Sequence, residues 1–243
     1  MLILALDTTT PAGSLALVRD GQLLDLAEGD PGETHAARLP GDILDCLARH
    51  HLTLGDLDLY GVAVGPGSFT GLRIGIATIQ GLAFAHGRPV VGVSALDALA
   101  EAAGPPSQER GGAPVLRAAW MDARRGEVYG RLYRPVGSTW QPMGQPLVGR
   151  PSDVVAAWFM SSTDGTVEFV GDGAVACRAE LASALGHRAS VIETVPPLAP
   201  AIATIAAREG AAGRAVAADA LRPLYIRRPD VELVRERRTR GLA

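Results

Sequence analysis

The sequence contains neither lysine nor asparagine, so arginine alone supplies its 23 basic side chains. We attribute this bias chiefly to the codon usage of a GC-rich genome, but it also restricts the chemistry of the chain. It excludes the phosphate-binding lysine of a P-loop, a lysine that forms a Schiff base, and asparagine as a metal ligand.

Cysteine and long hydrophobic runs are also scarce. Cys46 and Cys177 are far apart and neither belongs to a C-x-x-C pair, so we expect two buried thiols in a reducing compartment. The apolar runs are interrupted well before the length of a membrane span, and the N-terminus lacks the basic region of a signal peptide. We therefore expect a cytoplasmic protein with no membrane contact.

The overall composition is that of a globular protein with a substantial core. Of the 243 residues, 47% are hydrophobic and 20% are charged, which suffices for one large domain or two small lobes. The formal net charge of −3 is mild and argues against a general nucleic-acid-binding protein.

The first 103 residues are expected to form a first lobe. Three strand-like segments come first, and Asp20-Gly21 between the second and third is a strong signal for a hairpin turn. Helices and strands then alternate, which implies a mixed sheet with helices packed on it. The predicted strands are residues 1–7, 14–19, 22–28, 57–64 and 89–93, and the predicted helices are 36–50, 70–86 and 94–103.

A second, smaller lobe is expected over residues 115–221, after a linker rich in glycine and proline at 104–114. It should end in a helix at 199–210, followed by a solvated Arg-rich tail over 222–243, with contact to RNA phosphates as the weaker alternative for the tail. The order of elements resembles the ribonuclease-H-like lobes of the actin, sugar-kinase and chaperone-ATPase superfamily. We therefore predict an α/β fold of two such lobes, with mixed sheets flanked by helices.

The most informative stretch is Gly-Pro-Gly-Ser-Phe-Thr-Gly-Leu-Arg-Ile-Gly over residues 65–75. It joins a strand-like run to an apolar segment of helical length, a position where α/β proteins often bind anions. It lacks the spacing of a dinucleotide site and the lysine of a P-loop, and Pro66 removes one N–H donor. We favour a structural turn, with phosphate binding as the alternative.

The helix over residues 70–86 is apolar on almost every side and so must be covered all round. Gly71 and Gly75 lie one turn apart, and each costs about 1 kcal/mol relative to alanine inside a helix. Because such glycines tend to be kept where another backbone approaches closely, we favour a docking surface for another chain, with ordinary core packing as the alternative. Helix 36–50 should flank it. The predicted docking residues are Leu39, Ile43, Leu47, Gly71, Leu72, Gly75, Ile76 and Ile79.

Two further segments are candidate nucleotide-binding loops. Asp7, Thr8 and Thr9 follow the first strand, where the superfamily carries its first phosphate loop, but Thr9 stands where its ATPases usually have glycine. These residues could equally close the end of a hairpin. Gly171 and Gly173 follow a later strand and form the second candidate loop, on weak evidence.

Metal and hydrolase sites are not indicated. The five histidines form no H-x-x-x-H pair and no carboxylate or cysteine cluster supports them. Ser68 is not part of a G-x-S-x-G elbow. We therefore expect no metal and no catalytic residue in this chain.

Several motifs occur in an order that resembles one bacterial family. They are Asp7-Thr8-Thr9, the run at 65–75, Gly92-Val93-Ser94, the stretch Asp122-Ala-Arg-Arg-Gly-Glu-Val-Tyr129, and Pro223-Leu-Tyr-Ile-Arg227. This pattern looks like the TsaB (YeaZ) family of tRNA threonylcarbamoyladenosine biosynthesis proteins, over nearly the whole chain.

The resemblance implies a non-catalytic subunit that pairs with a TsaD-type transferase through the helices at 36–50 and 70–86, together with a TsaE-type ATPase. The complex modifies adenosine 37 of tRNA, so tRNA would be met indirectly. We further expect the chain to have no cofactor of its own, with ATP or ADP at the interface of the complex as the alternative. Without its partner, the apolar surface of these helices should associate with a second copy of the chain as a homodimer.

Two enzymatic alternatives remain open. The transferase of the family uses a histidine pair on the helix after the last strand of its first lobe, and the matching residues 94–103 contain no histidine. An active ATP-dependent, kinase-like enzyme would need a glycine-bearing first phosphate loop and a catalytic acid in a cleft. A glycoprotease-like metallohydrolase, the weaker alternative, would need metal ligands.

Overall fold

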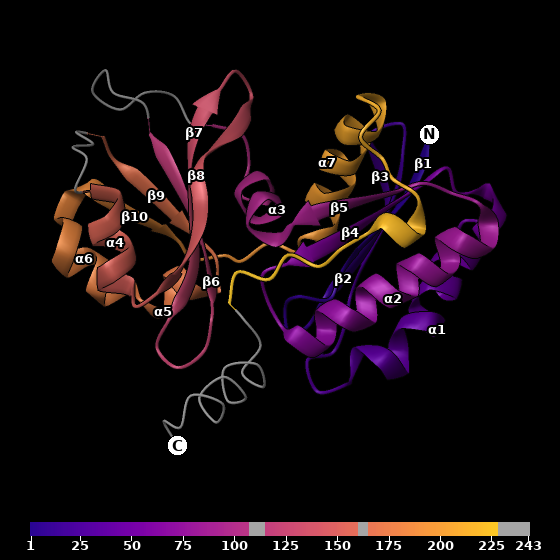
Figure 1. Cartoon of the computed structure of the whole chain (residues 1–243), viewed down its shortest axis with the longest axis horizontal. Coiled ribbons are helices and arrows are strands. Elements are labelled where there is room, and N and C mark those ends of the chain that lie inside the picture. Colours follow the sequence, from indigo (N-terminus) through magenta and orange to yellow (C-terminus); the bar gives the residue numbers. More distant parts are fainter. Residues whose placement is uncertain (107–114, 160–164, 228–243) are drawn as a thin grey trace, which may run out of the picture.

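The computed structural model describes residues 1–106, 115–159 and 165–227 of the chain, which form two lobes side by side (Figure 1). Each lobe is built on a five-stranded sheet, and the strand orders are β3-β2-β1-β4-β5 and β10-β9-β6-β7-β8. In both sheets the first strand of the lobe lies centrally, antiparallel to the next strand on one side and parallel to a later strand on the other. The prediction of two α/β lobes with mixed sheets is confirmed.

The first sheet is held between two helical layers. Its strands are β1 (Leu2–Asp7), β2 (Ser14–Arg19), β3 (Gln22–Glu28), β4 (Leu59–Gly65) and β5 (Val90–Ser94). Successive side chains of a strand point to opposite faces, so β1 serves both layers. Leu2, Leu4 and Leu6 pack towards α1 (His35–Arg49) and α2 (Phe69–His86), whereas Ile3 and Ala5 pack towards the opposite face. The predicted hairpin is also confirmed, with φ of 51° at Asp20 and 81° at Gly21.

The second lobe repeats this plan with shorter helices. Its strands are β6 (Leu116–Asp122), β7 (Val128–Val136), β8 (Thr139–Gly149), β9 (Val167–Val170) and β10 (Ala189–Ile192), and its helices are α4 (Pro151–Phe159), α5 (Asp172–Ala176) and α6 (Arg178–Leu185). Short 3-10 turns occur at Leu54–Asp56, Gly186–Arg188 and Ala218–Ala220.

Helix α3 (Ala95–Ala102) joins the two lobes into one core. Its buried residues belong to the same hydrophobic cluster as residues of β6, β7 and β8. The Tyr133 hydroxyl donates to Asp97 of α3 over 2.7 Å, and the Trp140 indole N–H donates to the carbonyl of Gly104 over 3.0 Å. The lobes therefore share a packed interface along α3.

The predicted extent of the second lobe, residues 115–221, is wrong at its C-terminal end. Helix α7 (Ala199–Ala211) packs on the first sheet, where Gly61 of β4 leaves room for Ile202 and Ala206. The chain then pairs Val216 with Val90 of β5. The apolar stripe of α7 predicts a helix but not which sheet it covers.

Two strands were missed and one helix is divided. Strand β8 contains Pro142, Gly144 and Pro146 and so gave no strand signal, but β8 lies at the edge of its sheet, where proline is tolerated. The short edge strand β10 also gave no clear signal. From the sequence alone we expect one helix over residues 175–185, and the structure has the pair α5 and α6 there. Most of the predicted linker (107–114) and most of the predicted tail (228–243) lie outside the described residues.

Candidate functional site

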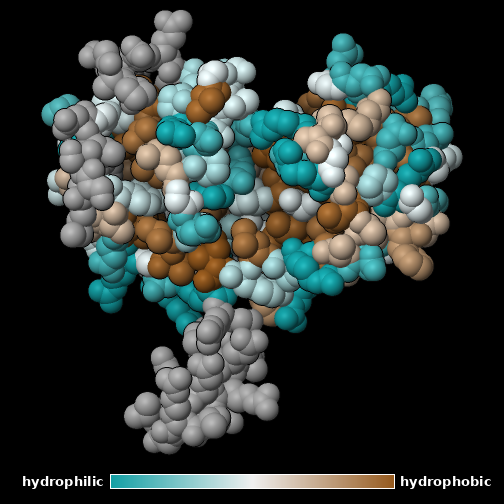
Figure 2. Space-filling model, turned by 45° about the horizontal axis from the view of Figure 1, so that its top comes forward, coloured by the Kyte–Doolittle hydropathy of each residue, from teal (hydrophilic) through white to brown (hydrophobic). Residues whose placement is uncertain are grey.

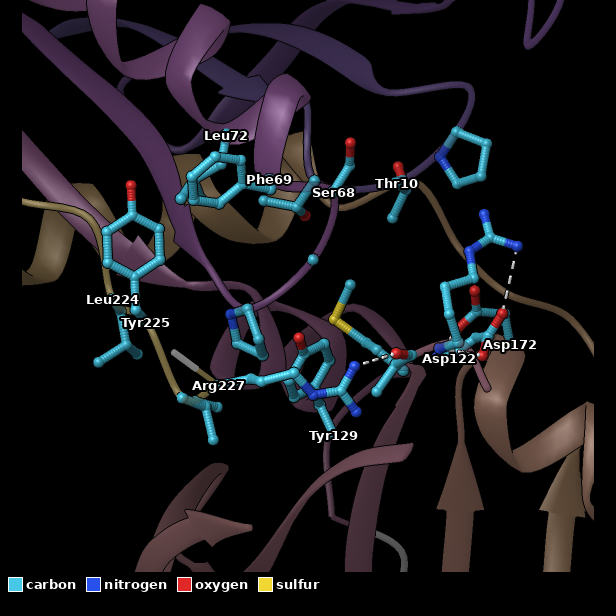
Figure 3. Close-up of a pocket in the computed structure, with 18 of the residues that line it drawn as sticks. Thr10, Ser68, Phe69, Leu72, Asp122, Tyr129, Asp172, Leu224, Tyr225 and Arg227 are labelled. Carbon is cyan, nitrogen blue, oxygen red and sulfur yellow. Dashed lines mark hydrogen bonds and ion pairs between the residues drawn. The ribbon is translucent and has the colours of Figure 1, made fainter. Parts of the chain in front are cut away.

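A cleft of about 920 Å³ lies between the two lobes. One wall comes from the loop after β1 and the start of α2, and the other from the β6–β7 turn with the start of α5. In Figure 3, Thr10, Ser68 and Phe69 lie on the first wall, opposite Asp122, Tyr129 and Asp172. In Figure 2, hydrophobic residues gather around the middle of the molecule, where the lobes meet.

The carboxylate of Asp7 is occupied by its own loop. Its Oδ1 accepts the backbone N–H of Thr9 over 2.8 Å and the Thr9 hydroxyl over 2.6 Å, and its Oδ2 accepts the Thr10 hydroxyl over 2.6 Å. Asp7 is only 1% exposed. Asp7 therefore closes the end of the β1–β2 hairpin. Both carboxylate oxygens already accept hydrogen bonds from Thr9 and Thr10, and a magnesium–phosphate group would have to displace these donors.

The helix glycines Gly71 and Gly75 make room for Thr8 of the same chain. A Cβ on Gly71 would lie 2.0 Å from the Thr8 carbonyl oxygen, and one on Gly75 would lie 2.2 Å from the Thr8 hydroxyl. The Thr8 hydroxyl in turn donates to the carbonyl of Gly71 over 2.8 Å. The expectation that these glycines admit another chain is therefore corrected, because the backbone that approaches them is that of the loop after β1.

The other predicted docking residues are core residues as well. The whole set (Leu39, Ile43, Leu47, Gly71, Leu72, Gly75, Ile76 and Ile79) is buried on the inner faces of α1 and α2. We correct the prediction accordingly: helical spacing identified the stripe that faces the chain's own sheet.

The outward faces of α1 and α2 carry small residues together with two large exposed apolar side chains. Phe84 is 81% exposed and Leu44 is 57% exposed, and Ala77 is exposed on the same helix as Phe84. A Cβ on Gly41 or Gly81 would meet nothing within 4 Å. No contact among the described residues requires glycine at either position. Glycine inside a helix was the sequence signal that we used to predict a docking surface, but we applied it to Gly71 and Gly75 rather than to Gly41 and Gly81.

The second candidate loop is also explained by packing. Gly171 has φ of +112°, and a Cβ there would lie 2.1 Å from the carbonyl oxygen of Trp120. A Cβ on Gly173 would lie 2.8 Å from the backbone of Met121. Between them, Asp172 reaches the cleft and accepts the backbone N–H of Asp122 over 3.0 Å. The loop thus ties α5 to the end of β6.

The β6–β7 turn presents two arginines to the cleft. Arg124 and Arg125 have φ of 62° and 61°, an uncommon conformation for residues with a side chain. The carboxylate of Asp122 stabilises it by accepting the Arg124 backbone N–H over 2.7 Å. The Arg124 side chain is 78% exposed and lies 3.4 Å from Asp122.

Residues 222–227 cross from the first lobe to the second along the cleft, where the sequence predicted the start of a solvated tail (Figure 1). The Leu224 backbone N–H donates to the carbonyl of Val64 over 2.7 Å, which anchors the segment to β4. At its far end, Arg227 donates to the carbonyl of Ala123 over 2.8 Å and forms an ion pair with Glu127. We call residues 222–227 the strap.

The described residues do not offer a metal site. Nowhere in the described ranges do three His, Cys, Asp or Glu side chains come together as ligands. His35 lies near the cleft, but its ring is engaged with the carbonyl of Thr10 (3.2 Å) and with Arg38 (3.0 Å). In the same part of the chain, each helix is too short or too polar to cross a bilayer.

The comparisons with known proteins agree with one another. The model of the TsaD family, described as tRNA N6-adenosine threonylcarbamoyltransferase, matches residues 31–236. The tRNA threonylcarbamoyladenosine biosynthesis protein TsaB of Escherichia coli K12 is 36% identical over 232 residues, which cover 93% of this chain and 95% of that protein.

Two solved structures from Pseudomonas aeruginosa share the fold. YeaZ superimposes with a TM-score of 0.73 at 31% identity, covering 92% of this chain and 99% of that one. An uncharacterized protein with similarity to peptidase YEAZ gives a TM-score of 0.75 at 33% identity, covering 93% and 99%.

Proposed function

The chain belongs to the TsaB (YeaZ) family of tRNA threonylcarbamoyladenosine biosynthesis proteins, and we propose that it serves there as a non-catalytic subunit. In this proposal it pairs with a TsaD-type transferase and supports its reaction on adenosine 37 of tRNA, together with a TsaE-type ATPase. It needs no cofactor of its own, and ATP or ADP is used at the interface of the complex.

The observation that carries the proposal is the outward apolar surface of α1 and α2. Its exposed residues include Gly41, Leu44, Ala77, Gly81 and Phe84, and we call this set the α1–α2 face. Exposed helix glycines cost stability, about 1 kcal/mol each relative to alanine, and small residues let a partner helix approach closely. Two neighbouring helices with such faces suit docking of a helical partner, and in its absence the same surface supports a homodimer.

The kinase-like alternative is less well supported. It would need an open carboxylate at Asp7 for a metal–nucleotide complex, and that carboxylate is buried and saturated by Thr9 and Thr10. The loop before α2 also packs directly against the loop after β1 and leaves little space there for a phosphate group. A Cβ on Gly67 would lie 2.5 Å from the Cβ of Thr9. A metallohydrolase lacks a ligand cluster in the described residues.

The test is a reconstitution with matched variants. Ala77→Arg and Gly81→Arg place a charge on the α1–α2 face, and Ala184→Arg places the same charge on an exposed position of α6. We expect the first two to abolish co-elution with the transferase and tRNA modification, while the control retains both. Pairing that survives both changes would move the docking site elsewhere. ATPase, kinase or peptidase turnover by the isolated chain that disappears in Asp7→Ala would contradict the non-catalytic role.

A further inference from the structure

The interlobe cleft combines aromatic rings with arginines, and docking through the α1–α2 face uses neither. The rings of Phe69 and Tyr225 lie 5.5 Å apart on one side, 41% and 40% exposed, and Tyr129 lies in the opposite wall (Figure 3). We propose that this cleft binds unpaired nucleotides of RNA directly, with bases on the rings and phosphates on arginines at the rim. The inference rests on the proposed role in tRNA modification and adds a direct RNA contact to it.

The rings offer the kind of platform on which bases stack. Aromatic side chains accept any base on their faces, which gives binding without strict sequence preference. A cleft of about 920 Å³ is at the upper end of small-molecule pockets and admits roughly one or two nucleotides. The site therefore fits a short unpaired stretch, such as a loop, rather than a duplex.

The arginines stand at both rims of the cleft. On the first wall, the guanidinium of Arg73 lies 4.0 Å from the centre of the Phe69 ring and donates to the Tyr225 hydroxyl over 3.3 Å. On the second wall, the β6–β7 turn carries Arg124 and Arg125 side by side at the cleft. Guanidinium groups pair with phosphate through charge-assisted hydrogen bonds. A strand between the walls would meet positive charge on each side.

The placement of charge favours a strand of RNA over a free nucleotide with magnesium. A nucleoside triphosphate would need its phosphates at the floor, where Asp7 is saturated and Gly67 packs on Thr9. The carboxylates in the second wall, Asp122 and Asp172, would repel phosphates from the interior. The remaining positions for phosphate are the arginines at the rim, which is where the backbone of an RNA would run while its bases enter.

The first test measures fluorescence anisotropy of a labelled ten-nucleotide single-stranded RNA with the full chain. In Arg124→Gly/Arg125→Gly the glycines tolerate the positive φ of the turn, so only the side chains are lost. Arg134→Ala/Arg178→Ala removes the same charge from exposed positions elsewhere on the second lobe. We expect about tenfold weaker binding for the first variant and a salt slope reduced by about 1.4, the value for two phosphate contacts on a single strand. The control should stay within twofold. If the cleft variant and the control variant lose RNA affinity equally, the proposal is overturned.

The second test addresses the rings and the ligand. Phe69→Leu keeps an apolar side chain at the start of α2 but removes the stacking surface, and should weaken RNA binding about tenfold. Unlabelled RNA should displace the probe, whereas displacement by ATP at the same nucleotide concentration would assign the cleft to a free nucleotide. Both cleft variants should still pair with the transferase. Loss of RNA binding with pairing intact supports the RNA site, whereas failure of the wild-type chain to pair would contradict only the docking proposal.

Discussion

The ring of Tyr225 lies 5.5 Å from the ring of Phe69, a residue more than 150 positions earlier in the chain, at a tilt of 34°. This contact fixes the strap to the start of α2, and the next residues carry the strap to the second lobe. The cleft is therefore bordered by a chain segment that touches both lobes, in addition to the packed interface along α3.

The strap should contribute to stability through Arg227. The Arg227→Ala change removes the hydrogen bond to the carbonyl of Ala123 and the ion pair with Glu127, both of which join the C-terminal segment to the second lobe. Because these groups are partly exposed, we expect a loss of about 1 kcal/mol in the free energy of unfolding. Hydrogen exchange should also become faster in the β6–β7 turn.

A control separates this effect from loss of charge alone. Arg134→Ala removes an exposed arginine of β7 whose side chain, among the described residues, donates within its own hairpin to Gln141. It should leave both the unfolding free energy and the exchange rates of the turn unchanged. If the two variants behave alike, the strap does not hold the lobes.

The glycines of α2 predict a pair of opposite outcomes. Gly75→Ala places a Cβ 2.2 Å from the Thr8 hydroxyl, and Gly71→Ala places one 2.0 Å from the Thr8 carbonyl oxygen. Each should destabilise the fold by about 3 kcal/mol through overpacking. The additional change Thr8→Ala removes the hydroxyl and should recover part of the loss in Gly75→Ala. It cannot recover Gly71→Ala, because that clash is with the backbone.

Denaturant unfolding of the three single variants, Gly71→Ala, Gly75→Ala and Thr8→Ala, and of the two double variants measures this coupling directly. Recovery in both double variants, or in neither, would show that the contact with Thr8 is not what requires glycine at these positions.

Structural features that depend on residues close together in the sequence could be predicted, whereas features that depend on distant contacts could not. The Asp20-Gly21 turn and the alternation of strands and helices are encoded by neighbouring residues, and they predicted the first lobe nearly as it is. The sheet covered by α7 and the role of Gly71 and Gly75 depend on contacts with residues far away in sequence, so a helical pattern could not decide them.

The residues of the cleft likewise divide into those that the sequence indicated and those that depend on contacts with distant residues. Asp7, Thr9 and the run at 65–75 were singled out as separate candidate loops, and the structure brings Thr9 and Gly67 together in the cleft. The contribution of Tyr225 and Arg227 was missed, because an arginine-rich end reads as solvated when its partners, Phe69 and Glu127, cannot be inferred.

The two thiols should differ in reactivity. Burial, with a smaller contribution from the nearby Asp25, raises the pKa of the Cys46 thiol to about 11, so at pH 8 only about one molecule in a thousand carries the thiolate. Burial also raises the pKa of Cys177, but that side chain is only partly covered. At pH 8, a thiol reagent should therefore label Cys177 first and Cys46 only as the protein unfolds.

The variants Cys46→Ser and Cys177→Ser assign the two phases of labelling. Rapid labelling of the native Cys177→Ser variant at pH 8 would show that Cys46 is neither buried nor protonated as described.

Gly81→Ala provides the sharpest separation of folding from docking. The position is exposed, helical and free of neighbours within 4 Å of a Cβ, so alanine should stabilise the isolated chain by about 1 kcal/mol. If a partner helix packs closely on the α1–α2 face, the same methyl group should weaken pairing with the transferase by about tenfold, because one added carbon blocks close approach of the backbones. Thermal unfolding of the isolated chain measures the effect on stability, and calorimetry of the complex measures the effect on pairing. Gly87→Ala is not a suitable control, because the φ of +61° at this exposed glycine would strain alanine. Ser183→Ala, on the exposed side of α6, is suitable and should leave pairing unchanged. A Gly81→Ala chain that is more stable and still pairs with full affinity would remove the reason we give for glycine at this position.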